Sequence, residues 1–254
     1  LIYYRLGIWY PGLLATLSLA PCVIEVNSLE LNELVSANSI KRQIYQSGRD
    51  PVLRKAAGFA PVSHEIAKDL AHLEKPSFVC GNGYDFPNEN NPARKIISKR
   101  PQALFIGTDD QPWHGVDFIL TWAKALPEID FHIVGILPWL EAPSNAVFHG
   151  TVFNEQLREL ARGMDFGIGT LALFRKQMNE ASPLKTREYG AWGLPFVYAF
   201  EDTDLPKDLD FVLRLENTET GVCRAAAQVK SFAYRVFHQP HNSERFRPFF
   251  DRRA

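Results

Sequence analysis

The chain has 254 residues, 46% of them hydrophobic, and a formal net charge of −1. This length suits one large domain or two modest ones with a sizeable core. The even charge balance implies no nucleic acid or other polyanion as partner. Three cysteines, Cys22, Cys80 and Cys223, lie far apart without a CxxC pair. An odd, scattered set argues against a disulfide framework, so we expect reduced thiols and a cytoplasmic location.

Residues 6–26 are largely apolar, but Pro11, Gly12 and Pro21 interrupt them. No uninterrupted part of this run reaches the ~20 clean apolar residues of a membrane-spanning helix. The chain also begins at Leu1, without an initiator methionine. We therefore expect a processed protein or a piece of a longer one.

Short β-branched or aromatic runs alternate with helical patterns along the whole chain, which is typical of βαβ units and a parallel sheet. In the first part the pattern predicts strands at 22–27, 58–62 and 77–80, and helices at 31–47 and 63–73, the second capped by Ser63. In the second part it predicts strands at 103–107, 131–135, 146–148, 166–170 and 196–199, helices at 116–126, 154–162 and 183–192, and a mostly helical end from Thr220.

Residues 81–92 are dense in turn formers. They are interpreted as the link between two domains, the alternative being a long surface loop within one domain. The expected organisation is a partial N-terminal domain with linker at 1–99, and a second domain at 100–254 that ends in a terminal helix.

The loop at 179–189 carries the richest chemistry. Ser182 is a suitable N-cap and Pro183 a suitable first helical residue. The N–H groups of Leu184 and Lys185 would then form an anion site, and a bound anion would explain a lysine in a first turn. A diphosphate there would place a sugar on one side, near Glu180, and a ribose on the other, and carboxylates such as those of Glu180 and Glu188 accept hydrogen bonds from pairs of sugar hydroxyls. For two glutamates taken alone, solvated charges beside a self-capped helix are the favoured interpretation.

The sequence around these two glutamates favours a ligand site over solvated charges. Glu180 and Glu188 have the E-x7-E spacing, and 182–195 reads SPLKTREYGAWGLP. Further marks are LFIG at 104–107 with WHGVD at 113–117, NAVFHG at 145–150, PVS at 61–63 and NGYD at 82–85. Together, over about residues 20–215, they resemble retaining glycosyltransferases of family four, whose GT-B fold has two Rossmann-like domains.

The resemblance implies that a nucleotide-diphospho-sugar binds the second domain. Its hexose would pass with retention to a saccharide or glycolipid acceptor held by the first domain, without metal or cofactor. The implied catalytic residues are Glu180 and Lys185, and the implied donor-binding residues are Gly107, Thr108, His114, Ser182, Leu184 and Glu188. On the acceptor side, Glu25 and Asn27 end a strand and would face the cleft, although ordinary strand-end polar residues are equally favoured.

Two departures from the family pattern matter. Thr108 and His114 stand where the family usually has arginine and lysine. Lys185 or a protonated His114 would replace that basic pair only in part. In addition, nothing before Leu1 supplies the family's opening strand and glycine-rich turn, so the first domain is expected to be incomplete. These departures favour an alternative, a truncated or degenerate relative that binds nucleotide-sugar without turnover. An epimerase on the same fold is less favoured.

Two weaker signals remain. Arginines at 245, 247, 252 and 253 alternate with phenylalanines at 246, 249 and 250. This is compatible with a peripheral contact at the inner face of an anionic membrane, but an amphipathic helix packing back on the first domain is favoured. Asp202 and Asp204 form a D-x-D, which elsewhere binds a metal-diphosphate and is here interpreted as a solvated turn.

Overall fold

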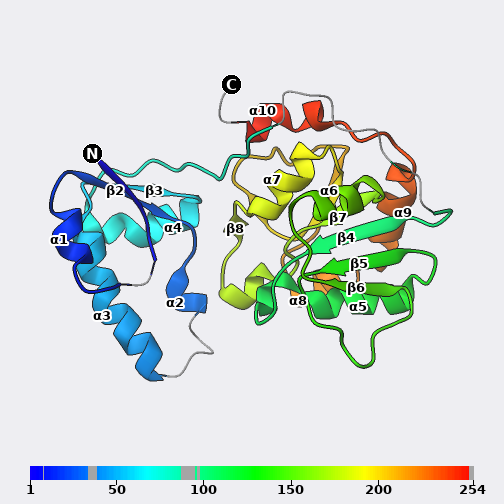
Figure 1. The fold of residues 1–254 in the computed structure, drawn as a ribbon, viewed down its shortest axis with the longest axis horizontal. Coiled ribbons are helices and arrows are strands. Elements are labelled where there is room, and N and C mark those ends of the chain that lie inside the picture. The colour runs from blue at the N-terminus through cyan, green and yellow to red at the C-terminus, as the bar shows by residue number, and fades with distance from the viewer. Residues whose placement is uncertain (8, 34–38, 87–94, 96–97, 252–254) are drawn as a thin grey trace. The chain divides into compact units, whose positions relative to one another are not determined.

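A computed structural model describes residues 1–7, 9–33, 39–86, 95 and 98–251. The chain forms two compact units. Unit 1 comprises Leu1–Gly81, Lys176–Ser182 and Glu201–Thr203, and unit 2 comprises Asn82–Arg175, Pro183–Phe200 and Asp204–Ala254. Both are α/β with parallel strands, which confirms the predicted fold class (Figure 1). The predicted division into folding domains at residues 99 and 100 stays a prediction.

The main sheet of unit 1 is parallel, in the order β1-β2-β3. Its strands are β1 (Ile2–Arg5), β2 (Cys22–Val26) and β3 (Gly58–Pro61). Its helices are α1 (Leu13–Leu17), α2 (Glu30–Glu33), α3 (Ser39–Lys55), α4 (His64–Leu70) and the 3-10 turn η2 (Ala71–Leu73). The central strand β2 buries Cys22, Ile24 and Val26 on alternate positions, as a strand between two neighbours requires.

Two predictions for unit 1 need correction, and a third is confirmed. Residues 34–38 of the helix expected at 31–47 lie outside the described residues. On either side the structure has α2 and α3, and α3 continues beyond the expected end to Lys55, through Gly48 and Pro51. The strand expected at 77–80 is reduced to a single bridge between Ser77 and Phe59. The predicted cap of α4 is confirmed, because Ser63 accepts a hydrogen bond from the Ile66 N–H.

A second, two-stranded sheet also belongs to unit 1. It pairs β8 (Glu180–Ala181) with β10 (Glu201–Asp202) in parallel. Both strands come from loops of the second half of the chain. Unit 1 is therefore built from three separate stretches of sequence.

Unit 2 holds a six-stranded parallel sheet in the order β11-β9-β7-β4-β5-β6. Its strands are β4 (Gln102–Ile106), β5 (Asp130–Val134), β6 (Ala146–Gly150), β7 (Phe166–Ile168), β9 (Phe196–Tyr198) and β11 (Val212–Arg214). From β4, the strands β5 and β6 extend to one side, and β7, β9 and β11 extend to the other. This is the Rossmann order, with its switch point between β4 and β7, where such sheets bind ligands.

The helices of unit 2 are α5 (Val116–Ala125), α6 (Asn154–Arg162), α7 (Leu184–Ala191), α8 (Glu219–Cys223), α9 (Ala226–Val236) and α10 (Arg247–Phe250), with 3-10 turns η3 (Pro112–His114) and η5 (Ser243–Arg245). The chain leaves unit 2 within a further turn, η4 (Leu173–Lys176). The three expected helices of this part are confirmed to within two residues at each end. The short strand β11, flanked by acidic residues, was not predicted.

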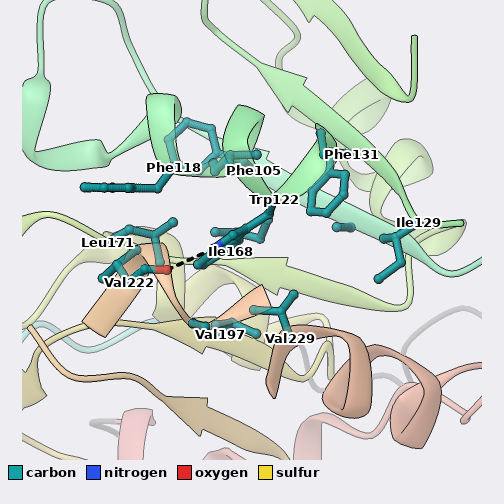
Figure 2. Close-up of a cluster of buried hydrophobic side chains, with 14 of the residues drawn as sticks. Phe105, Phe118, Trp122, Ile129, Phe131, Ile168, Leu171, Val197, Val222 and Val229 are labelled. Carbon is teal, nitrogen blue, oxygen red and sulfur yellow. Dashed lines mark hydrogen bonds between the residues drawn. The ribbon is translucent and has the colours of Figure 1, made fainter. Parts of the chain in front are cut away.

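The core of unit 2 lies between the sheet and helices α5, α8 and α9 (Figure 2). Trp122 of α5 is fully buried in it, and its indole N–H donates to the Val222 carbonyl at 3.0 Å. Phe105 and Phe131 of neighbouring strands belong to the same cluster. Replacing such a residue by alanine costs about 3–5 kcal/mol, so this cluster fixes the sheet whose strand ends carry the candidate site.

The described helices include none long and apolar enough to cross a membrane. All three cysteines are free thiols, with Cys22 buried and Cys80 and Cys223 exposed.

Candidate functional site

Tyr189 fixes helix α7 over the switch point of unit 2. Its buried hydroxyl donates to the carbonyls of Leu104 in β4 and Ile168 in β7, at 3.2 and 3.1 Å as alternative acceptors, and accepts from the Ile106 N–H at 3.2 Å. The ring fits because position 167 is glycine, where a Cβ would lie 2.5 Å from it. The start of α7 is thereby held at the carboxyl ends of β4 and β7.

Lys185, in the first turn of α7, carries a buried amine. Its Nζ lies 4.3 Å from the centre of the Phe105 ring, and no described residue gives it a hydrogen-bond acceptor. Burial lowers the pKa of Lys185 from 10.5 to about 7. The cation–π contact offsets part of the desolvation cost. The charge of this amine is therefore left without an anion at a place where the helix dipole also favours one.

Gly107 and His114 lie at the same ring. His114 is buried and meets Phe105 edge to face, with centroids 5.5 Å apart. A Cβ on Gly107 would lie 2.6 Å from the Phe105 ring and 2.8 Å from His114 Nδ1. Gly135, at φ +79°, approaches so closely that its Cβ would lie 2.0 Å from the Gly107 oxygen. Three predicted site residues, Gly107, His114 and Lys185, are thus brought together around Phe105.

Thr108 lies outside this cluster, in an open pocket of about 300 Å³ at the carboxyl ends of β4 and β5. Trp139 and Arg175 line the same pocket, and Arg175 is bound bidentately by Asp117 at 2.9 and 2.6 Å. The arginine is thus already neutralised.

Glu188, in the middle of α7, is half-buried. Burial raises its pKa, opposed by the Tyr84 hydroxyl and by the positive charge of Arg158. The Tyr84 contact is long, at 3.5 Å. The sequence analysis assigned no role to Tyr84 or Arg158, although Tyr84 belongs to the NGYD motif at 82–85.

The start of α7 corrects one prediction. The helix begins at Leu184 with Pro183 as N-cap, and no side chain caps it. Ser182 precedes the cap and belongs to unit 1, where it is buried. The proline's fixed φ suits the cap position as well as the first turn. The helix therefore begins one residue later than predicted, and the Leu184 side chain at its start is exposed.

Glu180 belongs to unit 1. Its Oε2 accepts hydrogen bonds from the backbone N–H groups of His64 and Glu65 at the start of α4, at 2.6 and 3.1 Å. His64 Nδ1 lies 3.6 Å from the same oxygen. The Glu180 side chain keeps 26% of its surface exposed. Periodicity in the sequence does not reveal this partnership across 115 residues.

The acceptor-side candidates form a small polar network in unit 1. Asn27 donates to Glu25 Oε1 at 2.6 Å, and Glu25 lies 3.6 Å from Arg5 of β1. Asn27 Oδ1 is buried and has no donor among the described residues. The network offers a polar acceptor group at the carboxyl end of β2.

Asp202 and Asp204 are not a solvated turn. Asp202 is buried in β10, and Asp204 forms an ion pair of 2.5 Å with the fully buried Arg187 of α7. Among the described residues, no three histidine, cysteine or acidic side chains gather in a group that could hold a metal ion.

The terminal phenylalanines Phe246 and Phe250 pack within unit 2. Phe246 and Phe250 are buried, Phe246 stacks on Phe196, and Phe250 lies under the Arg187 guanidinium at 4.4 Å. Arg252 and Arg253 lie outside the described residues.

No family model and no curated protein matches the sequence. Solved structures do match. Sucrose-phosphate synthase from Thermosynechococcus elongatus has a TM-score of 0.61 at 13% identity, over 90% of this chain and 63% of that one. TarM has a TM-score of 0.59 at 12% identity, over 91% and 50%. HepE from Anabaena, in complex with UDP and glucose, has 0.59 at 13%, over 91% and 68%. The chain thus spans between half and about two thirds of these structures, and shares their fold.

Proposed function

We propose that this chain binds a nucleotide-diphospho-sugar at the switch point of unit 2 and takes part in transfer of its hexose to a saccharide or glycolipid acceptor, with retention. One observation carries the proposal, the buried Lys185 amine that lacks an acceptor in the first turn of α7. A diphosphate would supply that acceptor and would meet the free N–H groups of the helix start.

The fold supports this assignment. The structural neighbours are GT-B glycosyltransferases, and HepE was crystallised with UDP and with UDP-glucose. A Rossmann-order sheet binds nucleotides beyond the carboxyl ends of its strands, where Gly107, His114 and Lys185 lie. Glycine at 107 lets a phosphate approach the backbone without a side chain between.

The residues take the following roles in this proposal. Lys185 and the N–H groups of Leu184 and Lys185 hold the diphosphate. Thr108, Ser182 and the buried His114 complete the surroundings of the donor. Glu188 binds the ribose and Glu180 the sugar, because carboxylates accept hydrogen bonds from hydroxyl pairs. Glu25 and Asn27 belong to the acceptor side. No metal or cofactor is needed, since Lys185 and the helix dipole neutralise the leaving diphosphate.

A second candidate is a nucleotide-sugar-binding relative without turnover. It is favoured by Thr108 and His114, which stand in place of two basic residues, and by the burial of the His114 ring. Lys185 would then be the one cation at the diphosphate, where the family pattern adds an arginine and a lysine at positions 108 and 114. The developing negative charge of the leaving diphosphate would be stabilised less.

Calorimetric titration with UDP, ADP, GDP and UDP-glucose tests the binding step. We expect one of the nucleotide diphosphates to bind in the micromolar range, and the Lys185→Met variant to bind it at least tenfold more weakly. Release of UDP from UDP-glucose to water, followed by NMR of the sugar's first-formed anomer, tests turnover and retention. Binding without release would support the second candidate, and no binding by the parent chain would exclude both.

A further inference from the structure

The loop that carries Glu180 is held from both ends by unit 1. At its start, the Lys176 carbonyl accepts from Asn32 Nδ2 at 2.8 Å, and the buried Lys176 amine binds Ser28 at 2.7 Å and the Glu33 carboxylate. Beyond it, β8 pairs with β10, and the neighbouring Thr203 hydroxyl donates to the Val62 carbonyl at 2.9 Å. The loop is therefore an integral part of unit 1 and not a free connection.

Glu65 is the residue that holds the middle of this loop. Its Oε2 accepts the backbone N–H groups of both Asn179 and Glu180, at 2.8 and 2.9 Å. Its Oε1 accepts from the Asn179 side-chain amide at 3.2 Å. Three donors thus converge on one carboxylate, and they fix the backbone on both sides of the peptide bond that leads into Glu180.

The Glu180 carboxylate in turn binds the backbone at Glu65. Its Oε2 accepts the N–H groups of His64 and of Glu65 itself. The two glutamates are each bound through the other's backbone, so neither carboxylate can rotate without breaking hydrogen bonds. Among the described residues, none donates to Glu180 Oε1. One oxygen of Glu180 is therefore anchored and the other stays open to accept hydrogen bonds.

We propose that Glu65 is a positioning residue for Glu180, which it holds so that Glu180 Oε1 is presented to a hydroxyl group of the donor sugar. The proposal rests on the proposed function for the identity of that ligand. Glu65 makes no contact with the donor in this arrangement and acts only through the loop backbone.

Comparing Glu65→Gln with Glu65→Ala tests whether the hydrogen bonds of the Glu65 side chain hold the loop. Glutamine keeps an oxygen that accepts both backbone N–H groups, and the Asn179 amide can turn to meet its NH₂ group. Alanine removes all three hydrogen bonds. Lys68→Ala is the matched control, because Lys68 lies on the exposed side of the same helix and its side chain has no hydrogen-bond or ionic partner among the described residues.

The experiment measures Kd for UDP and for UDP-glucose in the parent chain and in Glu65→Ala, Glu65→Gln, Glu180→Ala and Lys68→Ala. We expect Glu65→Ala to weaken UDP-glucose about tenfold, as Glu180→Ala does, with UDP unchanged within about twofold. Glu65→Gln and Lys68→Ala are expected to bind like the parent. Amide hydrogen exchange at Asn179 and Glu180 should speed up in Glu65→Ala and not in Glu65→Gln.

The outcomes separate this proposal from the one on which it rests. If Glu180→Ala weakens UDP-glucose selectively while Glu65→Ala does not, the positioning role is wrong and the proposed function stands. If Glu65→Ala weakens UDP and UDP-glucose equally, Glu65 supports the fold and not the sugar contact, which also overturns the proposal. If the parent binds neither UDP, ADP, GDP nor UDP-glucose, both proposals fail.

Discussion

The Nζ atom of Lys185 lies 4.3 Å from the centre of the Phe105 ring, with no hydrogen-bond acceptor from any described residue. An amine in this position weakens the fold, because its desolvation is offset only by the ring. The same amine favours any anion that reaches it. Stability and binding should therefore respond in opposite directions when it is removed.

Replacing Lys185 by methionine tests this opposition. Methionine keeps the length of the side chain and removes the buried charge, so we expect the free energy of unfolding to rise by about 1–2 kcal/mol. Affinity for UDP should fall at least tenfold, since a charge-assisted hydrogen bond contributes ~1.5–3 kcal/mol. Denaturant titration and calorimetry measure the two effects. Lys124→Met, on the exposed face of α5, is the control and should change neither. A loss of stability in Lys185→Met would contradict the burial argument.

Binding of a nucleotide diphosphate should be accompanied by proton uptake. Burial brings the pKa of Lys185 to about 7 in the free chain, and a bound diphosphate would raise it. At pH 8 the amine is mostly neutral before binding and charged after it. The terminal phosphate, with a pKa of ~6, is already ionised there. We expect about one proton taken up per UDP, measured as a binding enthalpy that differs between buffers of different ionisation enthalpy. Affinity should fall as pH rises above about 7. Uptake that persists in Lys185→Met would assign the proton to another group.

The two glutamates of the proposed donor site should have separable effects. Glu188 is assigned to the ribose, which UDP and UDP-glucose share, so Glu188→Ala should weaken both by about ten- to a hundredfold. Glu180 is assigned to the sugar alone, so Glu180→Ala should weaken only UDP-glucose. Titration of both variants with both ligands measures this. Equal weakening of UDP by the two variants would refute the division of roles.

The stability of unit 2 should fall in mild acid because of His132. Its Nδ1 lies 2.8 Å from His149 Nε2, and its Nε2 lies 2.8 Å from Gln102 Oε1. Burial first, and the neighbouring His149 second, lower the pKa of His132 from 6.5 to about 4, against the raising effect of Asp130. Between these values the unfolded chain binds a proton that the folded chain does not. The free energy of unfolding therefore decreases as pH falls from about 6.5 to 4, by about 2–3 kcal/mol.

His132→Leu should flatten this dependence in denaturant titrations at several pH values. A remainder is expected from His149, whose pKa burial also lowers. The exposed His72 offers the control variant His72→Asn, which should leave the dependence as it is. An unchanged slope in His132→Leu would place the acid sensitivity elsewhere.

Much of unit 2 could be predicted from the sequence because its elements are long or periodic. Helix α6 was predicted at 154–162, the bounds that it has. The helix predicted at 31–47 ends too early, because α3 continues through Gly48 and Pro51 to Lys55. The structure explains the glycine, since a Cβ there would lie 2.5 Å from the Trp9 side chain. Packing against Trp9 thus requires glycine at position 48, although glycine has a low helix propensity.

Some residues of the candidate site could likewise be predicted from the sequence, and others could not. Lys185 was identified because a first-turn lysine contradicts the helix dipole, and the structure brings it to Gly107 and His114. The aromatic platform, Phe105, was predicted only as part of a strand. Glu65 was not singled out at all, because its partner lies more than a hundred residues away in the chain.

The interleaving of the two units has a consequence for synthesis on the ribosome. The chain passes between them after Gly81, Arg175, Ser182, Phe200 and Thr203. Unit 1 therefore lacks β8 and β10 until residue 203 of 254 has emerged. Domains that fold as units commonly do so in order from the N-terminus during translation, but unit 1 gains these two strands only after residues 82–175 and 183–200 of unit 2 have been synthesised.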